Sequence, residues 1–278
     1  MKFDALGTRM KSYYEDRTRI MLPRRAYSIL RLDGRHFHTY TRGLQRPFDA
    51  GLIEDMDATA CYLCKNIQGA KFGFVQSDEI NILVTDFDAL TTDAWFDGNI
   101  QKIVSITASM ATAKFNQLRW IRYVNERYNK TTDEIGWIWF MDAAKLKLAE
   151  FDARVFTIPS KTEVANMFIW RQVDCVRNSI QSVAQSLYSH GKEKSELHGK
   201  NTNQMQEMIF QKGINWNDYD PKYKRGRFIT KVVINLETEF QGIDKKQSNY
   251  QRTRWISTEC PTFTTDMEFL YSRIPVME

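Results

Sequence analysis

The chain has 278 residues, of which 42% are apolar, and a formal net charge of +5. This length allows one large domain with its own hydrophobic core. No apolar run approaches the roughly 20 residues that a membrane-spanning helix needs, and the N-terminus lacks the apolar segment of a secretory signal. Four cysteines are too few for a disulfide framework in so long a chain, so we expect reduced thiols and a cytoplasmic location. The mildly basic charge is compatible with a polyanionic partner.

The first half of the chain alternates strand and helix patterns. Apolar residues at helical or alternating spacing predict, in order, a helix over 3–14, a strand over 27–32, a helix over 49–67, a half-buried hairpin over 71–85, a helix over about 95–122 and a strand over 151–158. Residues 123–150 have no regular pattern, and the aromatic residues 137–140 within them fit a short buried strand better than a base-stacking surface. Cys61 and Cys64 fall inside the second helix, and a single Cys-x-x-Cys pair there favours core thiols over zinc ligands.

The second half is predicted to be more helical. We expect a helix over 162–190, possibly in two pieces, a shorter helix over 203–211, a strand over 228–234 and a polar, mobile stretch over 238–254. The strand and helix order of the first half is that of ferredoxin-like folds, which polymerase palms and nucleotide cyclases share. We therefore predict an α+β fold with an antiparallel sheet and helices on one face. Residues 1–160 would form a palm-like catalytic region, and 161–278 a helical and β-hairpin elaboration packed on it as one unit.

Two acidic stretches at strand ends stand out. Asp33 and Gly34 follow the first strand, and Ser77, Asp78 and Glu79 form the tip of the predicted hairpin, which we expect to be exposed to solvent. If the two strands are neighbours, three carboxylates converge and repel one another unless cations lie between them, as in a nucleotide-binding Mg²⁺ site. Each stretch alone would be an ordinary turn. The two together favour the metal site.

Two further polar clusters have open interpretations. The helix over 162–190 contains a dense polar group at 171–178, which is either a solvated face or a ligand contact. The segment 222–227 holds the most concentrated basic cluster in the chain around Gly226, and it suits either phosphate binding or a basic loop.

Four motifs together resemble one family, in sequence order and with compatible spacing. They are Arg31-Leu32-Asp33-Gly34-Arg35-His36-Phe37-His38, Gln76-Ser77-Asp78-Glu79, Trp170-Arg171-Gln172-Val173-Asp174-Cys175 and Tyr223-Lys224-Arg225-Gly226. Over about residues 1–235 the chain resembles tRNA-His guanylyltransferase and its relatives. The resemblance implies a palm-like enzyme that adds nucleotides to the 5′ end of tRNA in the 3′-to-5′ direction. It implies two Mg²⁺ ions held by Asp33, Asp78 and the Gly34 carbonyl, and an acidic residue needed for activity at Glu79.

The resemblance also guides the assignment of binding residues. We assign nucleotide binding to Arg31, Arg35, His36, Phe37, His38, Arg46, Asp49, Ser77 and Lys102, and RNA or phosphate binding to Arg171, Asn178, Lys200, Tyr223, Lys224 and Arg225. Of these, family positions are matched directly by His38, Arg46, Ser77, Lys102, Asn178 and residues 223–225. Arg46 stands where the family usually has lysine, which changes the donor geometry but not the charge. ATP, GTP or other nucleoside triphosphates would be substrates, tRNA the partner and a homotetramer the assembly.

One departure from the family pattern affects the predicted substrate. Eukaryotic tRNA-His enzymes carry His-Ile-Asn-Asn after the Asp-Cys pair, whereas this chain has Val176-Arg177-Asn178-Ser179. This pattern is similar to the guanylyltransferase-like branch of bacteria, archaea and some phages or protists. It implies templated repair of 5′-truncated tRNA, after ATP-dependent 5′-adenylylation, rather than addition of a single G−1. The alternatives are G−1 addition, a cyclase or 5′-to-3′ polymerase on the same fold, and a non-catalytic tRNA-binding module with a vestigial site.

Overall fold

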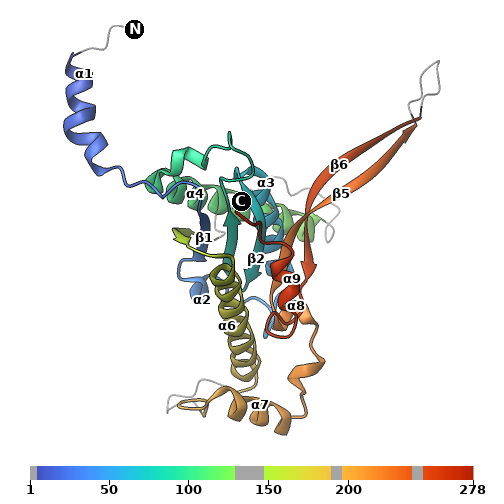
Figure 1. Cartoon of the computed structure of the whole chain (residues 1–278). Helices are drawn as coiled ribbons and strands as arrows, with labels where there is room; N and C mark the ends of the chain where they lie inside the picture. Colours follow the sequence, from blue (N-terminus) through green and yellow to red (C-terminus); the bar gives the residue numbers. More distant parts are fainter. Residues whose placement is uncertain (1–4, 129–146, 189–195, 240–246, 278) are drawn as a thin grey trace.

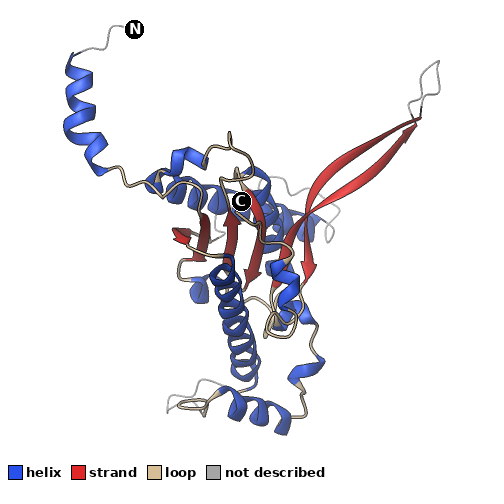
Figure 2. Cartoon of the chain, viewed as in Figure 1, coloured by secondary structure: helices blue, strands red, loops and turns tan. Residues whose placement is uncertain are grey.

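A six-stranded antiparallel sheet runs through the middle of the molecule (Figures 1 and 2). The computed structural model describes residues 5–128, 147–188, 196–239 and 247–277. The strands are β1 (Tyr27–Gly34), β2 (Ala70–Gln76), β3 (Glu79–Val84), β4 (Phe151–Ile158), β5 (Arg227–Glu239) and β6 (Gln247–Glu259), in the sheet order β4-β1-β3-β2-β5-β6. The helices are α1 (Ala5–Met10), α2 (Phe37–Tyr40), α3 (Ala50–Asn66), α4 (Ile100–Tyr128), α6 (Lys161–Leu187), α7 (Thr202–Gln211), α8 (Pro221–Lys224) and α9 (Met267–Tyr271). In this part of the chain, no helix is long and apolar enough to cross a membrane.

One face of the sheet is covered by α3 and α4. Alternate residues of β1 and β3, such as Leu30, Leu32 and Ile82, point to this face, as the period of a strand requires. They pack against Leu63 of α3 and Phe115 of α4. The order β1, α3, β2, β3, α4, β4 and the positions of these strands in the sheet agree with the α+β fold that the sequence predicts.

The opposite face is covered by α6, so the prediction of helices on one face was incomplete. Ile29 and Phe72 of the sheet pack against Phe168 of α6, and the Phe72 and Phe168 ring centroids are 4.8 Å apart. The reason is that a sheet with two apolar faces must bury both. The β2–β3 hairpin is accordingly buried on both faces along β3, not half-buried as its alternating pattern suggested.

Residues of the second half also extend the sheet. β5 pairs with β2, and β6 pairs with β5 along a long ribbon that leaves the body of the molecule (Figure 1). The prediction of a mobile stretch over 238–254 is therefore wrong for residues 247–254, which lie in β6. The sequence signal was weak because an exposed two-stranded ribbon has no apolar face that must be buried.

The predicted helices are present with different lengths. α6 is one continuous helix of 27 residues, not two pieces, and Ser160 caps its start by accepting a hydrogen bond from the Glu163 amide. α4 continues past 122 to Tyr128, and the aromatic residues 137–140 lie outside the described residues. The N-terminal helix predicted over 3–14 is α-helical over Ala5–Met10 and continues as a π-helical turn over Lys11–Glu15 and a 3-10 turn over Asp16–Thr18. It projects away from the body and has no buried residue (Figure 1). All four cysteines are free thiols, of which Cys64 is buried and Cys61 half-buried.

Candidate active site

Asp33 and Asp78 lie together at one end of the sheet. Asp33 is near the end of β1, and the register that pairs Leu32 with Ile80 places it beside the start of β3. Asp78 lies in the turn between β2 and β3, which Ser77 allows by adopting a left-handed backbone with φ of 44°. The two carboxylates, which the sequence predicts at two separate strand ends, thus lie at the same end of the sheet.

Both carboxyl groups are in surroundings that oppose their ionisation. Burial, followed by the charge of Asp33, raises the pKa of Asp78 to about 6. Burial, followed by the charges of Glu79 and Asp152, raises the pKa of Asp33 above its usual range. A bound cation would reverse both effects, because it favours the charged form of each carboxylate.

The carboxylates at this end of the sheet suit a magnesium ion whose other ligands come from the substrate. Within the described residues, no group of three or more His, Cys, Asp or Glu side chains is placed to hold a metal ion. A complete protein cage is therefore not formed there. Mg²⁺ in nucleotide enzymes is commonly held by one or two carboxylates, with water and phosphate oxygens completing its octahedron. Asp33 and Asp78 supply such a pair.

Gly34 is required next to Asp33 for a steric reason. A Cβ atom at this position would lie 2.2 Å from the ring of Phe37, which folds under the strand end. The glycine therefore lets the chain turn directly after Asp33 while the Phe37 ring packs below it. Its carbonyl remains a predicted metal ligand.

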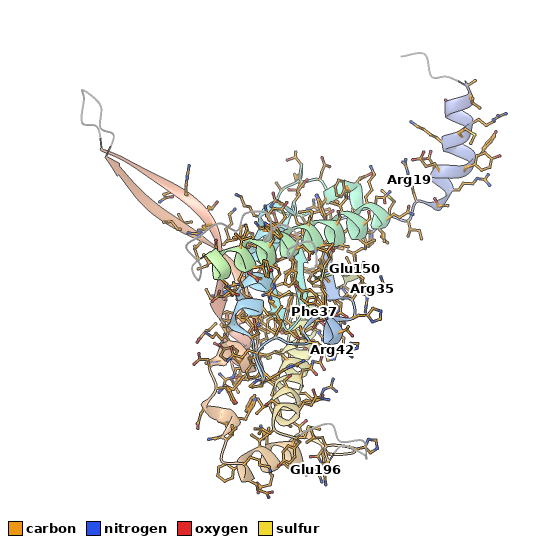
Figure 3. The ribbon with its side chains drawn as sticks, turned by 180° about the vertical axis from the view of Figure 1, so that it is seen from behind. Arg19, Arg35, Phe37, Arg42, Glu150 and Glu196 are labelled. Atoms are coloured by element: carbon orange, nitrogen blue, oxygen red, sulfur yellow. The ribbon has the colours of Figure 1, made fainter. Side chains whose placement is uncertain are left out.

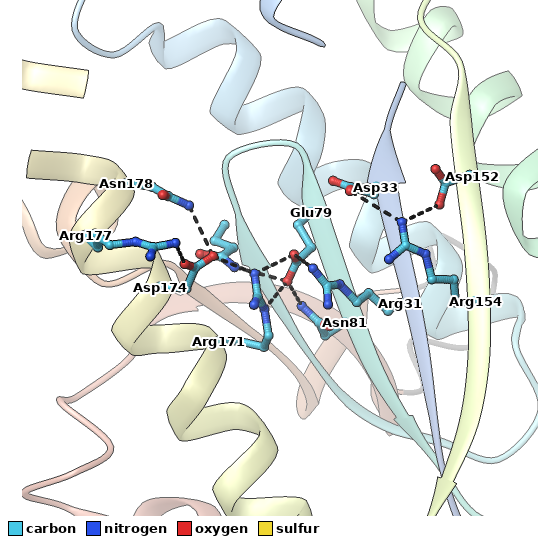
Figure 4. A network of polar contacts seen from close by, with 11 residues as sticks. Arg31, Asp33, Glu79, Asn81, Asp152, Arg154, Arg171, Asp174, Arg177 and Asn178 are labelled. Atoms are coloured by element: carbon cyan, nitrogen blue, oxygen red, sulfur yellow. Dashed lines mark hydrogen bonds and ion pairs between the residues drawn. The ribbon is translucent and has the colours of Figure 1, made fainter. Parts of the chain in front are cut away.

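Glu79 is buried, which corrects the prediction that the hairpin tip exposes it. Its side chain is 7% exposed and accepts five hydrogen bonds (Figure 4). Arg171 donates from Nε to Oε1 and from Nη2 to Oε2, each at 2.7 Å. Arg31 donates to Oε2 at 2.8 Å, and Asn81 and Gln76 donate to Oε1 at 2.7 and 3.1 Å. The charge of Glu79 is thus already neutralised by protein groups.

Arg171 and Arg31 are therefore structural partners of Glu79. Arg171 is 4% exposed, so its side chain is not available for the predicted RNA contact. The polar group 171–178 is solvated only in part, because Arg177 and Asn178 are exposed whereas Arg171 and Gln172 are buried. It lies on the side of α6 that meets the sheet, where the sheet face changes from the apolar Ile29 to the charged Arg31. Arg31 also pairs with Glu79 through its Nη2 atom, and its side chain is 19% exposed, so its nucleotide contact stays a prediction.

The ion pairs continue from Arg171 along α6. Its Nη2 atom donates to Asp174 at 2.8 Å, and Asp174 also accepts from Arg177 and, at 3.3 Å, from Asn178 (Figure 4). A connected set of polar contacts therefore links Glu79 at the hairpin to Asn178 on the exposed side of α6. This link was not predicted, because its members are distant in sequence.

Asp152 and Arg154 of β4 also lie beside Asp33, and neither was predicted from the sequence. Asp152 pairs in register with Asp33, and Arg154 Nη2 lies 3.9 Å from Asp33 and 3.5 Å from Asp152 (Figure 4). The sequence did contain a signal for them, because charged and apolar residues alternate at the start of the strand 151–158. Assigning it to the site required knowing that β4 is the strand beside β1.

A cavity of about 150 Å³ collects five of the predicted binding residues. Its lining includes Arg46, Asp49, Ser77, Asn178 and Tyr223. The Asp49 carboxylate also caps α3, accepting from the Leu52 amide at 2.7 Å. Gln76 and Ser77 of the β2–β3 turn also line the cavity, and Asp78 follows them directly in the chain.

An aromatic pair that the sequence did not predict forms part of the same cavity. The rings of Phe48 and Tyr223 are stacked, with centroids 4.9 Å apart and an interplanar angle of 14°. Flat aromatic surfaces of this kind suit the face of a nucleobase.

Several predicted residues lie elsewhere or serve the fold. The Phe37 ring is buried against Tyr40, Phe115 and Phe151, so a nucleotide contact from the ring is not available and the predicted contact would have to come from its main chain. Arg35 is exposed and pairs with Glu150 at 2.7 Å (Figure 3). His36 and His38 are exposed directly after the strand end, with ring centroids 6.3 Å apart.

Lys102 lies at the opposite end of the sheet from Ser77. Its neighbour Ile103 lines a cleft with Ser28 and Val84, which pair with each other four positions from Leu32 and Ile80. Four strand residues correspond to about 13 Å. Within one chain, the predicted grouping of Lys102 with Ser77 is therefore not formed.

The basic cluster at 222–227 is only partly available to phosphate. Lys224 is 6% exposed, and its Nζ donates to the Asn217 carbonyl at 2.5 Å, so its predicted phosphate contact is wrong. Arg227 is buried and pairs with Asp57 at 2.8 Å. Arg225 is half-buried, and Lys200 is exposed beyond the far end of α6, before α7.

Comparisons with known proteins agree with this geometry. Residues 7–159 match the sequence model of the tRNAHis guanylyltransferase family, which covers the acidic pair and four of the six strands. The chain belongs to the tRNAHis guanylyltransferase family. It is a family of nucleotidyltransferases, so the class of enzyme that the motifs predicted is confirmed.

Solved structures extend the similarity over nearly the whole chain. A bacterial tRNA(His) guanylyltransferase-like protein in complex with ATP is 40% identical, with a TM-score of 0.76, covering 98% of this chain and 100% of that chain. The corresponding complex with GTP is 38% identical, with a TM-score of 0.70 over the same shares. Among sequence relatives, a protein of Acanthamoeba polyphaga mimivirus is 29% identical over 84% of this chain and 80% of its own length. The tRNA(His) guanylyltransferase of Schizosaccharomyces pombe is 24% identical over 91% and 90%.

Proposed function

We propose that this chain is a Mg²⁺-dependent nucleotidyltransferase that adds nucleotides to the 5′ end of tRNA in the 3′-to-5′ direction. The observation that supports this most is the Asp33–Asp78 pair, with raised pKa values, beside a cavity lined by Arg46, Ser77 and Asn178. The order of strands β4-β1-β3-β2 supports a palm-like catalytic region. In this proposal, residues 161–278 are the elaboration that covers the second face and supplies Asn178.

Asp33 and Asp78, with the Gly34 carbonyl, are the residues that would hold magnesium. When bound, Mg²⁺ neutralises phosphate charge and activates the attacking oxygen. The two carboxylates would hold the ions, and the Arg31–Glu79–Arg171 cluster fixes the hairpin that carries Asp78. Positioning and charge neutralisation are the main protein contributions to phosphoryl transfer.

The cavity would bind the nucleoside triphosphate. Arg46 is exposed at its edge, where the guanidinium is available to triphosphate oxygens. The Phe48–Tyr223 pair provides an aromatic surface for a base, and Asn178 and Ser77 provide hydrogen-bonding groups. ATP would serve 5′-adenylylation, after which the 3′-hydroxyl of the incoming nucleotide attacks the activated 5′ end and releases AMP.

Templated repair of 5′-truncated tRNA is the reaction that we propose within this class. Of the segment 176–179, only Asn178 faces the cavity with an amide, whereas the hydroxyl of Ser179 accepts from Trp216 Nε1 at 3.0 Å. Ser179 also lines this cavity, so the chain places a hydroxyl group there, where the eukaryotic pattern has its second asparagine. This supports the repair branch over a dedicated G−1 activity. We also propose a homotetramer, as is usual in the family, and a cytoplasmic location.

A 5′-end-labelled nucleotide-addition assay tests the proposal. Full-length and 5′-truncated tRNAs are each incubated with the four nucleoside triphosphates and Mg²⁺, and the added nucleotide is identified. We expect the base opposite the added position to dictate which nucleotide is added, and addition of G alone regardless of that base would contradict repair. Asp33→Ala and Asp78→Ala should each lower addition by about 10³-fold, equivalent to about 4 kcal/mol.

The exposed neighbour of the site provides the control. Glu150→Gln removes an exposed carboxylate just before β4 that pairs with the exposed Arg35, and it should leave addition unchanged. Circular dichroism should show the same helix content in all variants. Undiminished addition by Asp33→Ala or Asp78→Ala would remove these residues from the proposed metal site.

A further inference from the structure

Trp170 is an exposed aromatic side chain beside Arg31 and Arg171, and it belongs to none of the buried core clusters of the described residues. It lies on α6, is 55% exposed and is the most exposed tryptophan among the described residues. Its neighbour Arg171 faces the sheet, so the indole lies on the flank of the helix. Exposing so large an apolar ring has a cost in water, and this makes it a candidate for contact with a partner.

Two arginines hold the indole from one side. The Cζ atoms of Arg171 and Arg31 lie 4.4 and 5.6 Å from the ring centroid. Both guanidinium groups donate to the same Glu79 oxygen, Oε2, so they approach the ring from the side of Glu79. The side away from Glu79 is therefore the exposed one. The cation–π contacts and the buried ion pairs keep the indole in place before any partner binds.

The position of Trp170 relates it to the reacting 5′ end. Arg31 and Asp33 are two residues apart on one strand, so both point to the α6 face and lie about 7 Å apart. The indole contacts Arg31, and it is therefore close to the nucleotides that adjoin a 5′ phosphate bound at Asp33.

The exposed surface around Trp170 suits RNA. Val173 is 55% exposed, and the Arg177 side chain is 65% exposed. Positions 170, 173 and 177 follow helical spacing and form one stripe, which begins with a flat ring and ends with a cation. Base–aromatic stacking tolerates any base, as an enzyme that acts on varied tRNA ends requires.

We propose that Trp170 stacks on a base at the 5′ end of the RNA acceptor stem and so orients the end toward Asp33 and Asp78. The inference rests on the proposed function, because it takes RNA as the substrate. The stacking surface would therefore belong to α6. Arg171, which pairs with Glu79 and contacts the indole ring, lies between this surface and the hairpin that carries Asp78.

Photocrosslinking tests the contact independently of catalysis. A 5′-truncated tRNA carries 5-iodouridine at one position at a time, either at the 5′ end or in the strand opposite it. Irradiation of the wild-type complex should crosslink Trp170, as mapped by mass spectrometry. Crosslinks that map only to other residues would overturn the proposal.

Matched variants measure the contribution to binding. Trp170→Leu keeps an apolar group over Arg31 and Arg171 but removes the flat ring, and it should weaken binding of truncated tRNA by roughly 5- to 150-fold. Trp170→Phe should stay within about threefold of wild type. Trp120→Leu on α4 removes another partly exposed indole and should have no effect. Unchanged affinity in Trp170→Leu, or a changed oligomeric state by light scattering with unchanged RNA affinity, would overturn the proposal.

The two proposals can fail separately. Wild-type protein that crosslinks through Trp170 but adds no nucleotide would contradict the proposed function and leave the stacking contact in place. Wild-type protein that adds nucleotides but crosslinks elsewhere would contradict only the stacking contact.

Discussion

Asp78 and Glu79 are adjacent in sequence but lie in opposite surroundings. Glu79 is buried and accepts five hydrogen bonds, four of them at 2.8 Å or less. Asp78 lies beside Asp33, and its pKa is raised to about 6. The difference shows that a carboxylate paired with arginine side chains stabilises the fold. A carboxylate that lies beside a second carboxylate is instead suited to bind a metal ion. This comparison separates the two roles that the sequence motif combines.

Removing Arg171 should have the largest effect on stability. Arg171→Met leaves Glu79 buried with one arginine instead of two, and loss of one partner of a buried ion pair costs about 3–5 kcal/mol. Arg177→Met is the matched control on the same helix. Its side chain is 65% exposed, so its loss should cost less than about 1 kcal/mol. Urea denaturation measures both, and equal effects would contradict the assigned structural role of Glu79 and its partners.

Neutralising Asp78 should raise the stability of the folded protein, and by less than the loss of Arg171 lowers it. Because the pKa of Asp78 is raised in the folded state, the folded protein binds a proton more tightly than the unfolded chain. Wild-type stability should therefore fall as pH rises from about 4 to 6 and remain lower above that range. Asp78→Asn removes this loss and should be more stable by about 1–2 kcal/mol at pH 7.5 without metal, and equal to wild type at pH 4.

Thermal denaturation at the two pH values, in EDTA, measures this difference. A variant that is less stable than wild type at pH 7.5 would show that Asp78 is already stabilised by protein groups. Its surroundings would then resemble those of Glu79, and the comparison would fail.

Of these residues, Arg154 should contribute least to the free energy of unfolding. Its Nη2 is 3.9 Å from Asp33, and both side chains are more than one third exposed. Arg154→Gln should change the unfolding free energy by less than about 1 kcal/mol, because solvent screens exposed pairs. A larger loss in urea denaturation would mean that Arg154 neutralises Asp33 as Arg171 does Glu79.

The sequence predicted the parts of the fold that rest on local patterns. Alternating apolar residues located β1, β2 and β3, and Asp49 marked the start of α3. The sequence could not show which faces are covered, because α6 reaches the sheet from a distant segment. For the same reason Asp152 was missed and Glu79 was expected to be exposed.

The candidate site shows the same limit. Ser77, Asn178 and Tyr223, which come from three separate motifs, line one cavity, and their binding roles stay predictions. They could not distinguish a charge that faces substrate from one that is paired inside the protein. Arg171 and Lys224 are in functional motifs, yet both are buried and bonded to protein groups. Phe37 belongs to the same motif as Asp33, but its ring packs in the core because the chain turns at Gly34.

Metal binding by three proteins tests the central claim most directly. Mn²⁺ is titrated into wild type, Asp78→Asn and Glu79→Gln at a saturating concentration of nucleoside triphosphate, and bound metal is measured by electron paramagnetic resonance. The signal of nucleotide alone is subtracted. We predict that Asp78→Asn weakens Mn²⁺ binding at least tenfold, whereas Glu79→Gln retains wild-type binding and loses stability. Equal weakening in both variants, or loss only in Glu79→Gln, would contradict the separate roles of the two carboxylates.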